Sequence, residues 1–238
     1  MITNQEQQLN IGVHNRGNDI LIIFDCDGVL VDSEPIANRI IVQCFQSEGF
    51  NVDLTFADKH FIGISTQDCI KYVELQFKRR VSQSFLRNYE NLTKREIKRS
   101  LQAIPNIIGA LELINYPKCI ASGSTPEKIK LSLEVTNIYK YFGSIFSATQ
   151  VKKGKPHPDI FLYASKEMGF KPDHCIVVED SDPGVQAALA AEMKPLLYRP
   201  HMDILGADSD KVKIFNDMSQ LPTIIEKLVS DKFRQASC

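Results

Sequence analysis

The chain lacks the features that mark several large classes of protein. Its 28 Lys and Arg residues are balanced by 29 Asp and Glu residues, so no charge excess predicts binding to a nucleic acid or a membrane surface. None of the six cysteines belongs to a CxxC pair, and the sequence has no internal repeat or low-complexity tract. No apolar run approaches the length that crosses a bilayer. These absences favour an ordinary globular protein that binds neither nucleic acid nor membrane.

The cysteines that are present lie scattered, most of them in apolar stretches where a reduced thiol behaves as a small apolar side chain. This distribution is typical of a reducing compartment. The polar N-terminal residues 1–18 lack the apolar centre of a signal peptide and are expected to form a flexible tail. We therefore expect a cytoplasmic protein. A monomer is expected, although the sequence carries no signal for the oligomeric state.

Short apolar segments alternate with helical patterns along most of the chain. The segments are ILIIFD, KCIAS, IFSAT, CIVVED, PLLYR and VKIF. They are apolar without alternation, as expected for strands that helices cover on both faces. The sequence therefore predicts an α/β fold built on a parallel sheet.

Residues 35–103 interrupt this alternation because they carry only helical patterns, among them IANRIIVQCFQSEGF and FLRNYENLTKREIKRSL. The segment Ala103-Ile104-Pro105 marks the return to the strand-and-helix pattern. We expect two domains, in which an all-helical insert at 35–103 interrupts a core formed by 19–34 and 104–238.

Two carboxylates one residue apart, Asp25 and Asp27, follow the first predicted strand. In open α/β sheets ligands bind at the carboxyl ends of the strands, where these side chains are expected. Their charges repel each other unless a cation or a shared proton separates them. Mg²⁺ suits such a place because one or two carboxylates beside a substrate phosphate complete its site. The alternative is a solvated acidic turn without chemical function.

A second acidic strand end, Glu179-Asp180, follows the segment CIVV. If Asp180 lies beside the first two aspartates, the three carboxylates form a site for a hard cation, and Glu179 binds through water or supports a ligand. Asp182 is better explained as the N-cap of the following helix. The alternative for Glu179 and Asp180 is a pair of carboxylates that interact with the helix dipole.

Two further segments are candidates for binding a phosphate group. Lys155 stands between Gly154 and Pro156, and a lysine held in this way can act as a fixed point charge for a phosphate and for a carboxylate nucleophile. Ser122 and Gly123 follow the predicted strand KCIAS, so a hydroxyl group and exposed N–H groups meet at the start of a predicted helix. The alternative for this second segment is an ordinary Ser/Thr N-cap.

In the order DxDGVLVDSE, SGS, GKPxPD and VVEDS, these four segments resemble the haloacid dehalogenase (HAD) superfamily of phosphotransferases, and the resemblance covers nearly the whole chain. The VDSEP continuation and the early helical insert are similar to the subgroup that contains β-phosphoglucomutase and small sugar-phosphate phosphatases such as 6-phosphogluconate phosphatase. The resemblance implies a Rossmann-like parallel-sheet core and an all-helical cap domain that closes over the site.

The resemblance also implies a role for each candidate residue. Asp25 would be the nucleophile that attacks phosphorus, and Asp27 the general acid for the leaving oxygen and then the general base for water. Ser122 and Lys155 would hold the phosphoryl oxygens, helped by the Gly123 N–H group. Four residues would bind Mg²⁺ or support its ligands: Asp25, Asp27 through its carbonyl oxygen, Glu179 and Asp180.

The expected function is that of a Mg²⁺-dependent phosphatase, which hydrolyses a sugar or sugar-acid phosphate through an aspartyl-phosphate. A dehalogenase is disfavoured because dehalogenation needs no acid such as Asp27. A phosphosugar mutase is an alternative, but Ala37 and Thr66 stand where the mutase pattern has a histidine and an arginine. Further alternatives are a non-catalytic protein that binds a phosphorylated metabolite and a phosphatase that acts on nucleotides.

Overall fold

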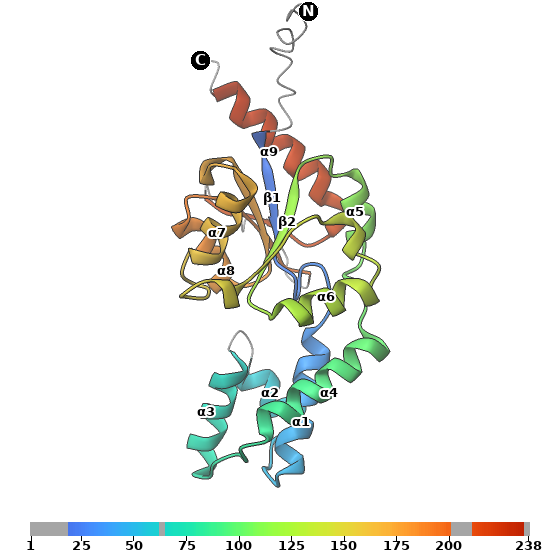
Figure 1. Ribbon diagram of the computed structural model, residues 1–238, viewed down its shortest axis with the longest axis vertical. Coiled ribbons are helices and arrows are strands. Elements are labelled where there is room, and N and C mark those ends of the chain that lie inside the picture. Colours follow the sequence, from blue (N-terminus) through green and yellow to red (C-terminus); the bar gives the residue numbers. More distant parts are fainter. Residues whose placement is uncertain (1–18, 62–64, 201–210, 236–238) are drawn as a thin grey trace, which may run out of the picture.

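The computed structural model describes residues 19–61, 65–200 and 211–235. The tail expected at residues 1–18 lies outside this part of the chain, as do residues 62–64 of the predicted insert. The described residues form a sheet covered by helices and, beyond one edge of that sheet, a group of helices (Figure 1).

Six parallel strands form one sheet within the described residues. The strands are β1 (Leu21–Phe24), β2 (Lys118–Ser122), β3 (Ile145–Ser147), β4 (Cys175–Glu179), β5 (Lys194–Tyr198) and β6 (Lys213–Phe215). Their order is β3-β2-β1-β4-β5-β6, so the chain winds outward from β1 on both sides. The six predicted strands and the α/β fold are confirmed, and this order puts the ligand-binding crevice beside β1.

Both faces of β1 are buried, which explains why its sequence is apolar without alternation. Ile22 and Phe24 belong to the apolar core on one face, which α5 (Ile107–Leu113), α6 (Pro126–Val135) and α9 (Leu221–Gln235) cover. Leu21 and Ile23 belong to the core on the other face, beneath α7 (Asp159–Met168) and α8 (Asp182–Ala190). A strand in this position buries every side chain, and all four of these are completely inaccessible to solvent.

The helices and short 3₁₀ turns that surround the sheet occupy most of the remaining core sequence. They are α5 (Ile107–Leu113), α6 (Pro126–Val135), η2 (Tyr139–Tyr141), η3 (Ala148–Gln150), α7 (Asp159–Met168), η4 (Pro172–His174), α8 (Asp182–Ala190), η5 (Met218–Gln220) and α9 (Leu221–Gln235). Among the described residues, no helix combines the length and the apolar character that crossing a membrane requires.

Ala103, at the end of the predicted insert, makes an isolated β-bridge to Val31, and the described residues before it form helices joined by loops, as the sequence predicted. The helices are α1 (Glu34–Ser47), α2 (Leu54–His60), α3 (Thr66–Phe77) and α4 (Phe85–Ser100), which lie together below the sheet in Figure 1. Side-chain oxygens cap two of them, because Asp53 accepts from Phe56 N and Ser65 accepts from Asp68 N. Buried phenylalanines join α1 to α4, with the rings of Phe45 and Phe85 4.7 Å apart.

The strand register aligns the chemically active segments at one edge of the sheet. Phe24 of β1 lies opposite Val178 of β4 and Ile120 of β2. Since all the strands are parallel, the residues that follow these three positions emerge at the same carboxyl edge. Asp25, Ser122 and Glu179 therefore come from three adjacent strands and meet next to the helical insert.

Candidate active site

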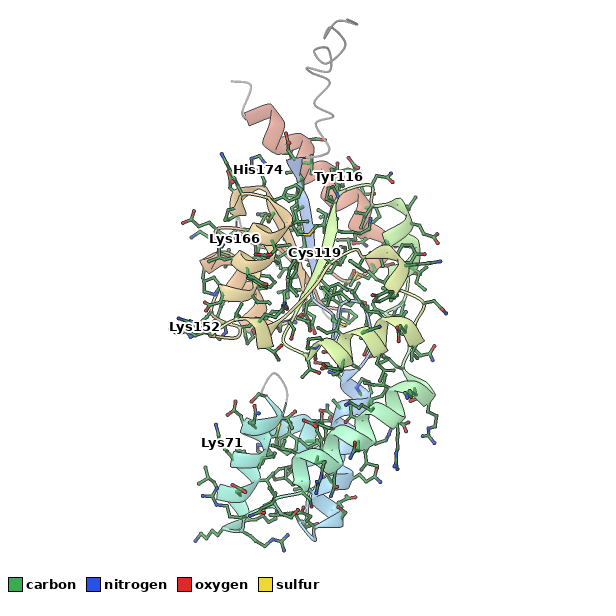
Figure 2. All side chains as sticks on the ribbon, viewed as in Figure 1. Lys71, Tyr116, Cys119, Lys152, Lys166 and His174 are labelled. Carbon is green, nitrogen blue, oxygen red and sulfur yellow. The ribbon has the colours of Figure 1, made fainter. Side chains whose placement is uncertain are left out.

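Asp25, directly after β1, contacts a lysine from a distant loop. The Lys155 Nζ atom lies 2.6 Å from Asp25 Oδ1 and also binds Glu179 Oε1. Asp25 is 6% exposed and Glu179 is completely buried. In Figure 2, Lys152 of the same loop lies at the end of the sheet that faces the insert, and His174 lies at the opposite end. One lysine thus joins two buried carboxylates at the edge expected to bind ligands.

The net effect of burial and the neighbouring charges is to raise the pKa values of both Lys155 and Asp25. Burial alone would lower the pKa of Lys155, but the two neighbouring carboxylates outweigh burial and hold that pKa above its usual value. The pKa of Asp25 is raised to about 7, because burial and the charge of Glu179 together outweigh the lowering effect of Lys155. The site therefore holds more negative charge than a single lysine neutralises.

Asp180 adds a third carboxylate to this group. Oxygen atoms of Asp25, Glu179 and Asp180 lie within 4.8 Å of one another. Burial raises the pKa of Asp180 to about 8, and the two neighbouring carboxylates add to the effect. Clustered carboxylate oxygens with too little positive charge are the ligands that a hard divalent cation such as Mg²⁺ prefers. These residues fit such an ion.

Two glycines make room for the acidic group. Gly28 has a φ of +77°, and a Cβ atom there would lie 2.0 Å from Asp180 Oδ2. A Cβ atom on Gly184, in α8, would lie 2.0 Å from Glu179 Cδ. Both distances are far below van der Waals contact, so any side chain at either position would displace an acidic residue. The position of Asp180 therefore explains why the DxDG segment has a glycine at residue 28.

Asp27 lies in a different environment from Asp25, although one residue separates them. Lys128 Nζ lies 2.9 Å from both of its carboxylate oxygens, and the Ser124 and Ser33 hydroxyl groups each donate to it at 2.5 Å. Burial alone would raise the pKa of Asp27, but Lys128 and the two serines outweigh burial and lower it. The Asp27 side chain stands apart from the acidic group, and its predicted role at the metal concerned its backbone carbonyl oxygen.

The predicted phosphate-binding segment lies between β2 and α6. Ser122 is 1% exposed, and its hydroxyl oxygen accepts a hydrogen bond from Ser124 N at 3.2 Å. A Cβ atom on Gly123 would meet nothing within 4 Å, so its backbone faces open space. The N-cap of α6 is Thr125, whose side chain accepts from Lys128 N. Because Thr125 caps the helix, the capping alternative does not account for Ser122.

A cavity of about 1230 Å³ opens beside the acidic group. Gly28 and Asp180 line it from the core, and Asn38 and Arg39 of α1 line it from the insert. The cavity connects the carboxyl edge of the sheet with the helical insert. A ligand bound there would contact both parts of the chain.

Comparison with known proteins agrees with this geometry. A family model described as haloacid dehalogenase-like hydrolase matches residues 22–197. The chain belongs to this family. It is 30% identical over 208 residues to 6-phosphogluconate phosphatase from Escherichia coli (strain K12), which covers 85% of this chain and 93% of that protein. It is also 30% identical over 177 residues to phosphorylated carbohydrates phosphatase from Thermotoga maritima, which covers 71% and 80% of the two chains.

A solved structure extends the comparison to three dimensions. The crystal structure of a conserved haloacid dehalogenase-like protein of unknown function from Agrobacterium tumefaciens str. C58 is 32% identical, with a TM-score of 0.75, and covers 89% of this chain and 99% of that chain. The expected superfamily is confirmed. This HAD-type protein is a phosphoric monoester hydrolase.

The HAD-type site also contains residues that sequence reasoning missed. Lys128, Ser124 and Ser33 surround Asp27, and none of them had been assigned to the site. Lys128 did carry a signal, because a lysine in the first turn of a helix is unfavourable for the helix dipole and needs another partner. Serines near a strand end carry no comparable signal.

The prediction that Asp182 is the N-cap of the helix after β4 was wrong. Asp182 is the first residue of α8, and Ser181 is the N-cap, whose hydroxyl oxygen accepts from Gly184 N at 3.1 Å. Ser181 has the extended backbone that an N-cap requires, with φ −114° and ψ 146°. Asp182 instead pairs with Arg199 at 2.7 Å.

Proposed function

We propose that this HAD-type phosphatase depends on Mg²⁺ and hydrolyses a sugar or sugar-acid phosphate through an aspartyl-phosphate on Asp25. The observation that carries the proposal is the position of Asp25, which ends the central strand, contacts Lys155 and belongs to the acidic group. A carboxylate attacks a phosphate dianion well only when positive charge offsets their repulsion. Lys155 supplies part of that charge in the structure.

Mg²⁺ would supply the rest of the positive charge by neutralising the phosphate oxygens. Asp25, the carbonyl oxygen of Asp27 and Asp180 would hold it, with Glu179 assisting. The raised pKa values of Asp25 and Asp180 support this assignment, because the same shortage of positive charge that favours protons favours a metal ion. Ser122, the Gly123 N–H group and Lys155 would bind the remaining phosphoryl oxygens.

The proposed reaction has two halves. In the first, an Asp25 oxygen attacks phosphorus while Asp27 gives its proton to the ester oxygen, so that the bond from phosphorus to that oxygen breaks and an alcohol leaves. In the second, the Asp27 carboxylate takes a proton from water, whose oxygen attacks phosphorus and frees Asp25. The sum is one phosphoester and one water converted to an alcohol and inorganic phosphate.

The substrate class rests on the relatives and on the cavity. Two relatives are named for 6-phosphogluconate and for phosphorylated carbohydrates. From the insert the cavity is lined by Asn38, whose amide suits hydroxyl groups, and by Arg39, whose guanidinium group also pairs with Glu96 at 2.7 Å. The insert would therefore select the organic part of the substrate while the core binds phosphate.

We further propose that residues 35–103 form a cap domain, separate from the core at 19–34 and 104–238, that closes over the site. The aromatic contacts of Phe45 within the insert support it as a unit with its own packing. We also propose that the protein is a cytoplasmic monomer. The five cysteines of the described residues are all buried free thiols, which suits a reducing compartment. Light scattering on the purified protein tests the monomer.

A substrate panel tests the proposed function. Sugar phosphates, sugar-acid phosphates, nucleotides and bisphosphates are each incubated with the protein in Mg²⁺ and in a chelator, beside Asp25→Asn. We expect phosphate release from sugar or sugar-acid phosphates in Mg²⁺ only, and none from the variant. Conversion of β-glucose 1-phosphate to glucose 6-phosphate without phosphate release would instead indicate a mutase. Metal binding without either activity would indicate a non-catalytic binding protein.

A further inference from the structure

The contacts of Lys128 go beyond what a surface lysine makes. Its ammonium nitrogen lies 2.9 Å from both carboxylate oxygens of Asp27 and 3.0 Å from Ser124 Oγ. The two side chains are only 29% and 26% exposed. A symmetric contact to both oxygens fixes the plane of the carboxylate as well as its distance.

Helix stability does not explain this lysine. Lys128 lies in the first turn of α6, where the positive end of the helix dipole disfavours a cation. Ordering its long side chain also costs conformational entropy. Lys130, two residues further along the same helix, is 60% exposed and reaches Glu134 at 3.8 Å, which is the weak pair expected of a helix surface. The cost of placing Lys128 is therefore offset at Asp27.

Lys128 connects Asp27 to the segment that carries Ser122. Ser124 lies two residues after Ser122, donates to Asp27 and accepts from Lys128. Lys128 itself belongs to the helix that this segment opens. Asp27 is thus tied to the segment between β2 and α6 by two side chains. Any movement of that segment carries the Asp27 carboxylate with it.

We propose that Lys128 is a positioning residue, which orients the Asp27 carboxylate relative to the phosphate held by Ser122. The inference rests on the proposed function, in which Asp27 exchanges protons with the ester oxygen and with water. Proton transfer requires the two heavy atoms to lie within hydrogen-bond reach, and a misplacement of about 1 Å can cost about 100-fold in rate. In this scheme Lys128 acts on the reaction only through its contacts with the Asp27 carboxylate.

A leaving-group comparison tests the proposal. A sugar alkoxide leaves only when an acid protonates it, whereas p-nitrophenolate leaves without protonation. The value of kcat/KM reports only the steps up to departure of the leaving group, so it isolates the acid step. For Lys128→Met we expect kcat/KM to fall about 10- to 100-fold with the sugar phosphate and by less than about threefold with p-nitrophenyl phosphate. Lys128→Arg is expected to restore part of the loss.

Lys130→Met is the matched control, because it removes a lysine from the same helix without touching Asp27. It should leave both kcat/KM values unchanged. Equal losses with the two substrates in Lys128→Met, or no loss with either, would overturn the positioning role. If Lys128→Met fails to fold by circular dichroism, Lys128→Gln carries the same comparison. A wild-type protein that releases phosphate from neither substrate would refute the proposed function itself, which separates the two failures.

Discussion

The sheet edge and the helical insert both contain ion pairs, but in very different surroundings. At the sheet edge, Lys155 is 13% exposed and contacts the buried Asp25 and Glu179. In the insert, Arg80 is 88% exposed and lies 2.7 Å from Glu74, whose side chain is 12% exposed. The chemical groups are similar and the distances are short in both places. The burial of the cation is what differs.

Burial decides what each pair can contribute. An exposed pair gains little because water screens it and two flexible side chains must be ordered. Burying a cluster of charges costs desolvation energy, and the attraction between the charges offsets this cost only in part. A buried cluster is therefore weak evidence for stability. Groups with shifted pKa values in such a cluster are instead typical of functional sites. The contrast indicates that the buried charges of the core edge are arranged for chemistry, whereas the exposed pair of the insert contributes little. Four experiments test this contrast.

The largest effect is expected from Lys155→Met. This change removes the positive charge beside Asp25 and leaves Glu179 without its partner. We expect kcat/KM for phosphate release to fall by about 1000-fold or more, because the phosphoryl oxygens lose a preorganised cation. Steady-state kinetics measure it. Lys153→Met, in the exposed part of the same loop, is the control and should retain wild-type activity.

A second large effect is expected from Gly28→Ala. The added methyl group would lie 2.0 Å from Asp180 Oδ2, on a backbone with a φ of +77°. We expect a loss of about 1 to 3 kcal/mol in the free energy of unfolding, together with weaker Mg²⁺ binding. Urea denaturation and calorimetric titration measure the two. Gly109→Ala in α5, where a Cβ atom meets nothing within 4 Å, should be neutral or stabilising.

A moderate effect is expected from pH and Mg²⁺ together. The folded state raises the pKa values of Asp25 and Asp180 from 3.8 to about 7 and about 8. Between these limits the metal-free folded protein binds more protons than the unfolded chain, so this contribution to stability is complete below pH 3.8 and is lost as pH rises to about 8.

Mg²⁺ competes with those protons for the same carboxylates. The increase in melting temperature on adding Mg²⁺ should therefore grow from pH 5 to pH 8, and at about 100 times Kd the ion stabilises by about 2.7 kcal/mol. Thermal denaturation over this range measures the effect. Asp180→Asn is the control, and a Mg²⁺ shift that it leaves intact would refute the assigned ligands.

The smallest effect is expected from Arg80→Ala in the insert. Its partner Glu74 keeps a hydrogen bond from Val81 N at 3.0 Å, and the arginine is almost fully exposed. We expect a change below about 0.5 kcal/mol in the free energy of unfolding and no change in kcat/KM. Denaturation and steady-state assays check both. A loss comparable with that of Lys155→Met would remove the distinction between the two regions.

Most of the fold could be predicted from the sequence, because each strand of a buried parallel sheet has a recognisable apolar pattern in its own segment. ILIIFD and CIVVED each show a fully buried strand that ends in a carboxylate, and strand direction then brings Asp25 and Glu179 to one edge. The register that sets Asp25 level with Glu179 follows from pairing between distant segments, which no single segment reveals.

The surroundings of Asp27 could not be predicted, because they too depend on contacts between distant segments. Its partners are 6, 97 and 101 residues away along the chain. Serine and lysine are common surface residues, and the position of Lys128 in the first turn of a helix indicates that it needs a partner without identifying that partner. Only the tertiary position of α6 determines which of its lysines reaches the carboxylate.

Chemical trapping of the intermediate tests the central claim most directly. The protein is mixed with Mg²⁺ and the best substrate of the panel, quenched in acid within the first turnover, and its peptides are mapped by mass spectrometry. The account predicts a phosphoryl group on Asp25 in the wild-type protein and none at that position in Asp25→Asn. Rapid phosphate release with no phosphoryl group on Asp25, or with one on a different residue, would contradict it.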